Sequence, residues 1–310
     1  MSPGDLEIWL NHFEHHALRP RRVPRGLSDI LTADESRLIA SSIATFQLGE
    51  QAGGRTLLRA AERFARTNEM PHLVRIIDLL IREERRHALL LRAFMQDHRM
   101  AVKSTDWTDR AFPRIRRLAG LHLYLSVLIS AELIGTVYYR ALESATNCRR
   151  LQVLCRTLVA DELAHIGFES QLLLALRARS GAASRALTRL VHLIFFAGTT
   201  IVVWVTHRSV LHRAGHSARS FLRACLAQFT FYLEPTGADS KRALYLPSSA
   251  RRGDLREKRR DDVADALGAL IDRDGLRGAG RAELRRSELV EYRENTCGRQ
   301  VRGTGDREYR

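Results

Sequence analysis

Two Glu-x-x-His motifs occupy core positions of predicted helices. The first joins Glu84 to His87, and the second joins Glu162 to His165. Residues three apart on a helix lie one above the other on the same face. Each motif interrupts a run of apolar side chains spaced by three and four residues, so a carboxylate and an imidazole would face the protein core. These are the residue types that bind divalent metal ions or carry out acid–base chemistry.

A single inward glutamate is expected opposite each motif. Glu50 and Glu84 are equidistant from a turn near Thr67. Glu132 and Glu162 are equidistant from a second turn. Residues equidistant from the turn of an antiparallel helical hairpin lie at the same height. Two such hairpins packed together would bring four carboxylates and two imidazoles to one level of a helix bundle.

Four buried carboxylates need positive charge beside them. Leaving them unpaired would cost far more than the net stability of a domain, which is about 5–15 kcal/mol. No arginine lies on the four inward stripes, whereas two divalent metal ions would cancel four negative charges. Carboxylate oxygens with one histidine per metal favour iron or manganese over zinc. The pattern therefore predicts a site for two iron ions, with a mixed manganese/iron pair as the alternative.

A third Glu-x-x-His pair provides an internal control. One such motif alone is a weak indication of a metal site. Glu69 and His72 fit the spacing, but they straddle a turn that contains Pro71 and lie mostly outside the apolar stripes. We therefore expect this pair to bind no metal.

The elements that position these residues are predicted to be helices. Pro and Gly are sparse between about residues 28 and 233, and apolar residues recur there at three- and four-residue steps. The first helix opens at Thr32 or Asp34, and the second has Pro71 in its first turn. The predicted helices cover residues 33–67, 71–99, 113–145, 149–179, 184–212 and 216–233. The fold class is therefore all-α, a four-helix bundle with additional C-terminal helices.

The chain is organised in three predicted parts. Residues 1–30 form an N-terminal extension without the apolar region of a signal peptide. Residues 31–233 form the helical domain. Residues 234–310 are rich in Arg, Asp, Glu and Gly and are expected to be a largely disordered, charged tail. Residues 190–206 are strongly apolar but contain His192 and threonines, so a buried helix is favoured over a membrane span.

Composition restricts the partners and the compartment. The formal net charge is +15, but the basic residues are 47 Arg and only 3 Lys, a skew that also follows from a GC-rich genome. The charge is therefore not taken as a sign of a nucleic-acid partner. Four cysteines without a Cys-x-x-Cys pair indicate free thiols in a reducing, cytoplasmic environment and exclude a thiolate metal site.

The segments EERRH (83–87) and DELAH (161–165), each with its partner glutamate, resemble the ferritin-like di-iron carboxylate proteins. The pattern is most similar to di-iron oxygenases of the p-aminobenzoate N-oxygenase type and covers about residues 33–180. The resemblance implies a ferritin-like four-helix bundle. It also implies that Glu84 and Glu162 bridge the two metals and that Glu50 and Glu132 are terminal ligands. His87 and His165 would each bind one metal. N-oxygenase-type proteins carry a further ligand histidine where this chain has Leu158.

Neighbouring residues are assigned more than one role. Glu83 and Asp161 either accept hydrogen bonds from the ligand histidines of the opposite hairpin or lie on a solvated face. Glu169 is either an extra metal ligand or ion-path carboxylate, or the partner of an arginine at the helix end. Glycines beside the motifs either leave room for dioxygen or a substrate or allow close helix packing: Gly49, Gly53 and Gly135. Other candidates are expected to be structural or superficial: Tyr138, Tyr139, His192, His207, His212, His216, His12, His15 and His16.

The chemistry expected of such a site is oxidation by dioxygen. An organic small molecule would undergo hydroxylation, N-oxygenation or desaturation. An external reductase would be required, because the chain contains no flavin or Gly-rich nucleotide motif. A homodimer is compatible with the sequence, whereas a membrane or nucleic-acid partner is not favoured. The alternatives are an iron-oxidising or peroxide-scavenging protein, a tRNA-modifying hydroxylase, and a scaffold that has lost its metal.

Overall fold

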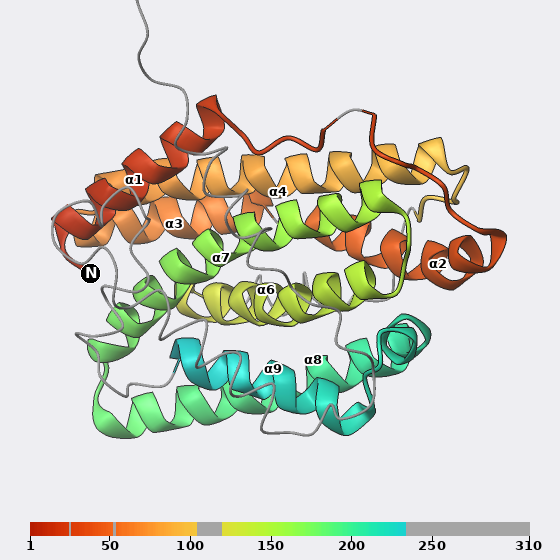
Figure 1. Cartoon of the computed structure of the whole chain (residues 1–310). Coiled ribbons are helices and arrows are strands. Elements are labelled where there is room, and N and C mark those ends of the chain that lie inside the picture. The colour runs from red at the N-terminus through yellow and green to blue at the C-terminus, as the bar shows by residue number, and fades with distance from the viewer. Residues whose placement is uncertain (25, 52–53, 104–119, 234–310) are drawn as a thin grey trace, which may run out of the picture. The chain divides into compact units, whose positions relative to one another are not determined.

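The computed structural model describes residues 1–24, 26–51, 54–103 and 120–233. Within these ranges every regular element is helical, so the all-α fold class is confirmed (Figure 1). The chain divides into two units, Met1–Asp254 and Leu255–Arg310, and the described residues all belong to the first. The predicted tail, 234–310, lies outside the described residues.

Helix α1 (Pro3–Leu18) occupies most of the predicted N-terminal extension. The Ser2 hydroxyl accepts a hydrogen bond from the Asp5 amide, and the Asp5 carboxylate accepts one from the Ser2 amide. This capping box satisfies two N–H groups that a helix start otherwise leaves unpaired. The buried face of α1 is an apolar stripe at three- and four-residue spacing: Leu6, Trp9 and Phe13. Helix α1 packs against helix α4 (Pro71–Asp97), and Trp9 and Phe13 of the stripe also contact Phe168.

The prediction of a single helix over residues 33–67 is wrong, because the structure has two helices there. Helix α2 (Ala33–Glu50) begins after the N-cap Thr32, and helix α3 (Gly54–Asn68) follows a break. Residues 52 and 53 lie outside the described part of the chain. A Cβ built on Gly54 would lie 2.6 Å from Cγ2 of Ile81 on α4, so only glycine fits this close approach. The break places Glu50 at a helix end rather than in mid-helix.

We expect Gly54→Ala to destabilise the protein by about 1–3 kcal/mol, because the added methyl group would displace the branched Ile81 side chain. Gly49→Ala is the matched control, since its Cβ would meet no atom within 4 Å. Removing that helical glycine should stabilise the protein by about 0.5–1 kcal/mol. The free energy of unfolding in urea measures both effects. Equal effects of the two substitutions would show that the close approach at Gly54 carries no energetic weight.

Helices α4, α6 (Leu121–Ser144) and α7 (Arg149–Ala178) form the centre of the bundle. Helices α6 and α7 are joined by four residues and pack along each other, and α4 packs against α2, α3 and α7. Pro71 stands in the first turn of α4, as the sequence predicts. Helix α6 was expected from residue 113, but it begins at Leu121 after the N-cap Gly120. Residues 113–119 lie outside the described residues.

Helices α8 (Ala182–Arg213) and α9 (Ala218–Leu233) lie on the other side of α6 from α1 and α4 (Figure 1). One face of α8 packs against α6, α9 and α2. The expectation that residues 190–206 form a buried helix is wrong, because only 17% of the most apolar window of α8 is buried. The corresponding value for α6 is 78%. By length and composition both helices could cross a membrane, but burial identifies α6 as a core helix.

Candidate metal centre

The six residues of the predicted metal site lie together inside the bundle. They form two groups that share Glu84 and Glu162. The first group adds Glu50 and His87, and the second adds Glu132 and His165. Within each group the potential ligand atoms lie within 4.8 Å of one another, and the two imidazole rings have centroids 5.8 Å apart. The arrangement therefore offers two adjacent cation positions with two carboxylates common to both.

Several polar atoms of this cluster are buried without a hydrogen-bond partner. They are Nδ1 of His87 and His165, Oε1 of Glu84, Oε2 of Glu162 and both carboxylate oxygens of Glu132. Nδ1 of His165 lies 3.0 Å from Oε1 of Glu84, yet the two groups lack the alignment of a hydrogen bond. Orphaned buried polar atoms are rare in proteins. Their concentration at one level fits atoms that point at a cation rather than at each other.

Each imidazole is held by a carboxylate from the opposite hairpin. Nε2 of His87 on α4 donates to Asp161 on α7 at 3.1 Å. Nε2 of His165 on α7 donates to Glu83 on α4 at 3.0 Å. A proton on Nε2 leaves the lone pair on Nδ1, so both rings present Nδ1 to the space among the glutamates. Glu83 and Asp161 are 8% and 1% exposed, so neither lies on a solvated face.

Helix α1 and the segment after it add a layer of charge outside these carboxylates. Nδ1 of His16 lies 2.5 Å from Glu83. Arg21 hydrogen-bonds Nε2 of His16 at 3.1 Å and also pairs with Asp161. Arg86 on α4 donates to Glu83 at 3.2 Å and pairs with Asp161 as well. The cations near the site therefore neutralise the two outer carboxylates, while the ion pairs of the four inner glutamates in the described chain are with histidines.

The prediction that the three N-terminal histidines are superficial is correct only for His15. His16 is 12% exposed in its side chain, and burial lowers the pKa of His12 to about 4. Sequence reasoning missed α1, although two signals were present. Ser2 and Asp5 have the spacing of a capping box, and the apolar stripe beyond them has helical periodicity.

Without metal, this site retains protons. Burial, reinforced by the charges of Glu162 and Glu50, raises the pKa of Glu84 to about 8. Burial, with the charge of Glu169 next, raises the pKa of Glu132 well above its usual range. Burial alone would lower the pKa of His87, but contacts with Asp161 and Glu162 raise it. His165 behaves in the same way. Cations bound here would displace these protons.

Glu162 differs from its neighbours in its ionisation. Burial raises the pKa of this carboxyl group, but contacts with His165 and His87 outweigh burial and hold the pKa below its usual value. Glu162 therefore stays ionised beside both imidazoles. It lies at the centre of the cluster, in contact range of Nδ1 of both rings at 3.4 and 3.1 Å.

Two residues outside the predicted set adjoin it. The Tyr139 hydroxyl donates a hydrogen bond to Glu50, so Tyr139 does more than fill the core. Burial and then the Glu50 charge raise the pKa of Tyr139, which keeps its proton on oxygen. Glu169 is fully buried, and its titratable neighbours are His165, Glu132, Glu84 and Glu162 rather than an arginine. The seven-residue spacing from Glu162 to Glu169 places both on one face of the helix, so the sequence alone indicated that Glu169 lies near the cluster.

The other candidates do not join the cluster. His192 hydrogen-bonds Ser130 at 2.9 Å and accepts from Arg177 at 2.6 Å. His207 hydrogen-bonds Ser42 at 2.8 Å, and Ser42 in turn bonds Tyr138 at 2.6 Å. Among the described residues, neither these two nor the two remaining C-terminal histidines, His212 and His216, belong to either group of ligand atoms.

The glycines beside the ligands are not required by close packing. A Cβ at Gly135 would make ordinary contacts with Tyr139 at 3.9 Å and Phe46 at 4.0 Å, and one at Gly49 would meet no atom within 4 Å. Gly53 lies outside the described residues. A methyl group would therefore fit at Gly135 or Gly49 without displacing a neighbour.

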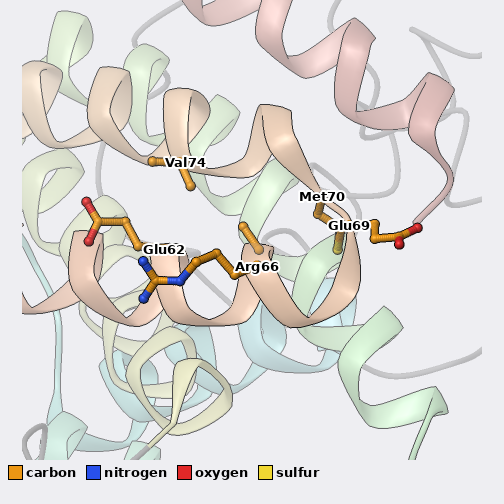
Figure 2. Close-up of a pocket in the computed structure, with 6 residues that line it drawn as sticks. Glu62, Arg66, Glu69, Met70 and Val74 are labelled. Carbon is orange, nitrogen blue, oxygen red and sulfur yellow. The ribbon is translucent and has the colours of Figure 1, made fainter.

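The control motif lies outside the site. Glu69 and His72 are exposed at the turn between α3 and α4, and Glu69 has a left-handed φ of 51°. Glu69 also borders an open pocket between these two helices, whose other lining residues include Arg66 and Val74 (Figure 2). Val74 precedes Glu84 by about 15 Å along α4. This pocket is therefore not part of the metal centre.

We expect Asp161→Asn to weaken metal binding about 10–100-fold, because an amide is a poorer acceptor for His87 and cannot balance Arg21 and Arg86. The number of ions bound at saturation should not change. Titration with Mn²⁺, followed by calorimetry, measures the affinity. Asp78→Asn is the matched control on α4, since Asp78 pairs only with surface arginines in the described contacts. Loss of one ion per chain in Asp161→Asn would instead make Asp161 a ligand.

Comparison of the chain with protein families, with curated proteins and with solved structures gives no match. Interpretation of the site therefore depends on its own geometry. That geometry is a buried cluster of four glutamates and two histidines, set in an all-helical domain, that could hold metal ions.

Proposed function

We propose that the protein is a ferritin-like di-iron oxidoreductase that uses dioxygen to oxidise an organic small molecule. The observation that carries this proposal is the pair of ligand groups sharing Glu84 and Glu162, with unpartnered Nδ1 atoms on both histidines. The donor set of four carboxylates and two imidazoles suits iron, or a manganese/iron pair, better than zinc. Two divalent ions would also offset the four negative charges.

When bound, two ferrous ions supply electrons for the reduction of dioxygen. Glu50, Glu84, His87 and Glu162 would hold one ion, and Glu84, Glu132, Glu162 and His165 would hold the other. Asp161 and Glu83 keep the imidazole protons on Nε2 and fix the orientation of the rings.

Residues of the bundle shape the surroundings of these ligands. Tyr139 holds its proton against Glu50 and so limits the orientations open to that carboxylate. On the α1 side, the buried Phe13 ring packs against the ring of His165, with centroids 5.9 Å apart.

The substrate would be a small organic molecule oxidised by hydroxylation, N-oxygenation or desaturation, and electrons would come from a separate reductase. Leu158 is fully buried at the position where N-oxygenase-type proteins have a seventh ligand. The ligand set here therefore has six protein residues. Three buried cysteines, Cys148, Cys155 and Cys225, are free thiols, which is consistent with a cytoplasmic protein.

One observation favours an alternative, iron oxidation without an organic substrate. Glu169 places a fifth buried carboxylate next to Glu132. Iron-oxidising proteins need carboxylates along which ions enter or leave, whereas an oxygenase does not release its metal. A peroxide-scavenging protein would share this ligand set.

Metal analysis and rapid mixing with dioxygen test the proposal. Protein loaded anaerobically with Fe²⁺ should retain two iron ions per chain after desalting. After mixing with dioxygen, an oxygenase should keep both ions and consume dioxygen in proportion to added reductant. Release or mineralisation of ferric iron would favour the alternative. Retention of fewer than one ion per chain would contradict both functions.

A further inference from the structure

Helix α8 has a second apolar face that no described residue covers. Its seam positions are spaced alternately by three and four residues, and all eight are exposed: Ser184, Leu187, Val191, Ile194, Gly198, Ile201, Val205 and Arg208. Of the apolar members, Leu187 and Ile194 are both 63% exposed, and Val205 is 60% exposed. The opposite face of α8, which includes His192, Phe196 and His207, is buried against the bundle. The helix is therefore apolar on two faces, and the described part of the chain packs against only one of them.

The exposed area is large enough to stabilise an interface. Leu190 and Leu193 extend the seam on one side and are 54% and 39% exposed. Together with the seam they make seven apolar side chains that are 39–63% exposed, an area on the order of the roughly 800 Å² that each partner contributes to a standard protein interface. Monomeric soluble proteins rarely expose a contiguous apolar patch of this size without a function for it.

The spacing of the seam indicates what covers it. A repeat of 3.5 residues is the signature of a helix that packs lengthwise against another helix. Gly198 stands near the middle of the seam, and a Cβ there would meet no atom within 4 Å. No contact among residues 1–24, 26–51, 54–103 and 120–233 explains a glycine in mid-helix, where it destabilises relative to alanine. A second helix crossing at this point would use the space.

We propose that α8 is the dimer interface of the protein and pairs antiparallel with α8 of a second copy. A two-fold axis between Ile194 and Gly198 would set each Ile194 against Gly198 of the other copy. It would also set Arg208 opposite Ser184. Parallel pairing would instead bring the two Arg208 guanidinium groups together at the seam, where like charges repel. This inference does not depend on metal binding.

The mass of the full-length protein in solution tests the interface. Sedimentation at micromolar concentration should give twice the chain mass of 35.2 kDa. The double variant Ile194→Asp with Ile201→Asp should be monomeric, with a dimer dissociation constant at least 100-fold higher. Its helical circular dichroism should be unchanged, because both side chains are exposed in the single chain. Thr206→Asp, exposed on α8 outside the seam, should remain dimeric.

Disulfide trapping tests the direction of pairing. The fourth cysteine of the sequence, Cys297, is first replaced by serine, which leaves only the three buried thiols of the parent chain. In this background, Ser184→Cys combined with Arg208→Cys should form a covalent dimer on mild oxidation, and neither substitution alone should do so. A covalent dimer from Arg208→Cys alone would overturn the antiparallel arrangement.

Three outcomes would overturn the dimer itself. The seam variant could remain dimeric, which would place the interface elsewhere. The unmodified protein could be monomeric with α8 protected from solvent in hydrogen exchange, which would make the C-terminal tail the cover. It could also be monomeric and bind vesicles of phosphatidylglycerol in a manner lost in the seam variant, which would make the partner a membrane.

Discussion

Replacing Glu84 or Glu162 with alanine is expected to abolish binding of both metal ions. Each of these residues belongs to both groups of ligand atoms, so each substitution removes an oxygen from both cation positions. The stoichiometry should fall from two ions per chain to near zero, as measured by elemental analysis of protein loaded with Fe²⁺ without oxygen. Glu50→Ala removes a residue from one group only and should leave about one ion bound, with reduced affinity.

The control for this prediction is Glu69→Ala, which should keep two ions per chain. Glu69 has the same Glu-x-x-His spacing but lies exposed in the turn before α4. A second control separates metal loss from misfolding. Glu84→Gln keeps the volume of the side chain and removes one repelling charge, so the metal-free variant should be more stable than the parent protein by about 1–3 kcal/mol at pH 8. Equal metal loss in Glu69→Ala and Glu84→Ala would reject the site.

The metal-free protein is expected to lose stability as the pH rises from about 6 to 8. Glu84, with a pKa raised to about 8, and His87 and His165, with pKa values above the usual 6.5, hold protons in the folded state that the unfolded chain has released. A folded state that binds more protons than the unfolded state loses stability as the pH increases. The stability that these groups contribute is fully present below their pKa values in the unfolded chain. It is lost as the pH rises through their pKa values in the folded protein. The expected loss is about 2–4 kcal/mol.

The opposite limb of this profile comes from the outer carboxylates. Burial raises the pKa of Glu83 and Asp161, but contacts with His16 and His165 for the former and with His87 for the latter lower both below their usual range. Their contribution to stability is present above about pH 4.5 and is lost as the pH falls through the folded pKa values. Maximum stability of the metal-free protein should therefore lie between about pH 4.5 and 6.

Bound metal should remove the loss at high pH. Because ligands bind metal in their deprotonated forms, affinity increases as the pH rises. Urea unfolding from pH 5 to 8.5, with chelator in one series and excess Mn²⁺ in the other, measures both profiles. The two curves should diverge above pH 6, and Glu84→Gln should flatten the chelator curve. A metal-free protein that is as stable at pH 8 as at pH 6 would mean that the inner carboxylates are hydrated rather than buried together.

The core of the candidate site followed from local rules. Helical periodicity placed Glu84 and His87 on one inward face, and distance from a turn paired Glu84 with Glu50. Both rules depend on short stretches of chain, so one sequence is sufficient to apply them. The break between α2 and α3 did not disturb the result, because Glu50 is the last residue of α2 and keeps its height opposite α4.

The features of the site that could not be predicted from the sequence depend on contacts between segments that are distant along the chain. Asp161 receives Arg21 because α1 docks on α4, and it receives Arg86 because α4 packs against α7. No periodicity within one helix predicts which helix will cover another. The tight fit of Gly54 against Ile81 is likewise a contact across two helices. Such contacts are selected by shape and charge in three dimensions, after the helices have formed.

The sequence by itself determined that the protein is helical and that two Glu-x-x-His pairs and two glutamates face inward. The periodic spacing of side chains on a helix is a property of the backbone, and it is written in the order of residues. Only the tertiary structure decided that Nδ1 rather than Nε2 of His87 and His165 faces the glutamates. It alone decided that α8 buries the stripe of Phe196 and leaves the stripe of Ile194 exposed. Both stripes are apolar and helical in period, so the choice depends on which surfaces of α6 and α9 are available to pack against.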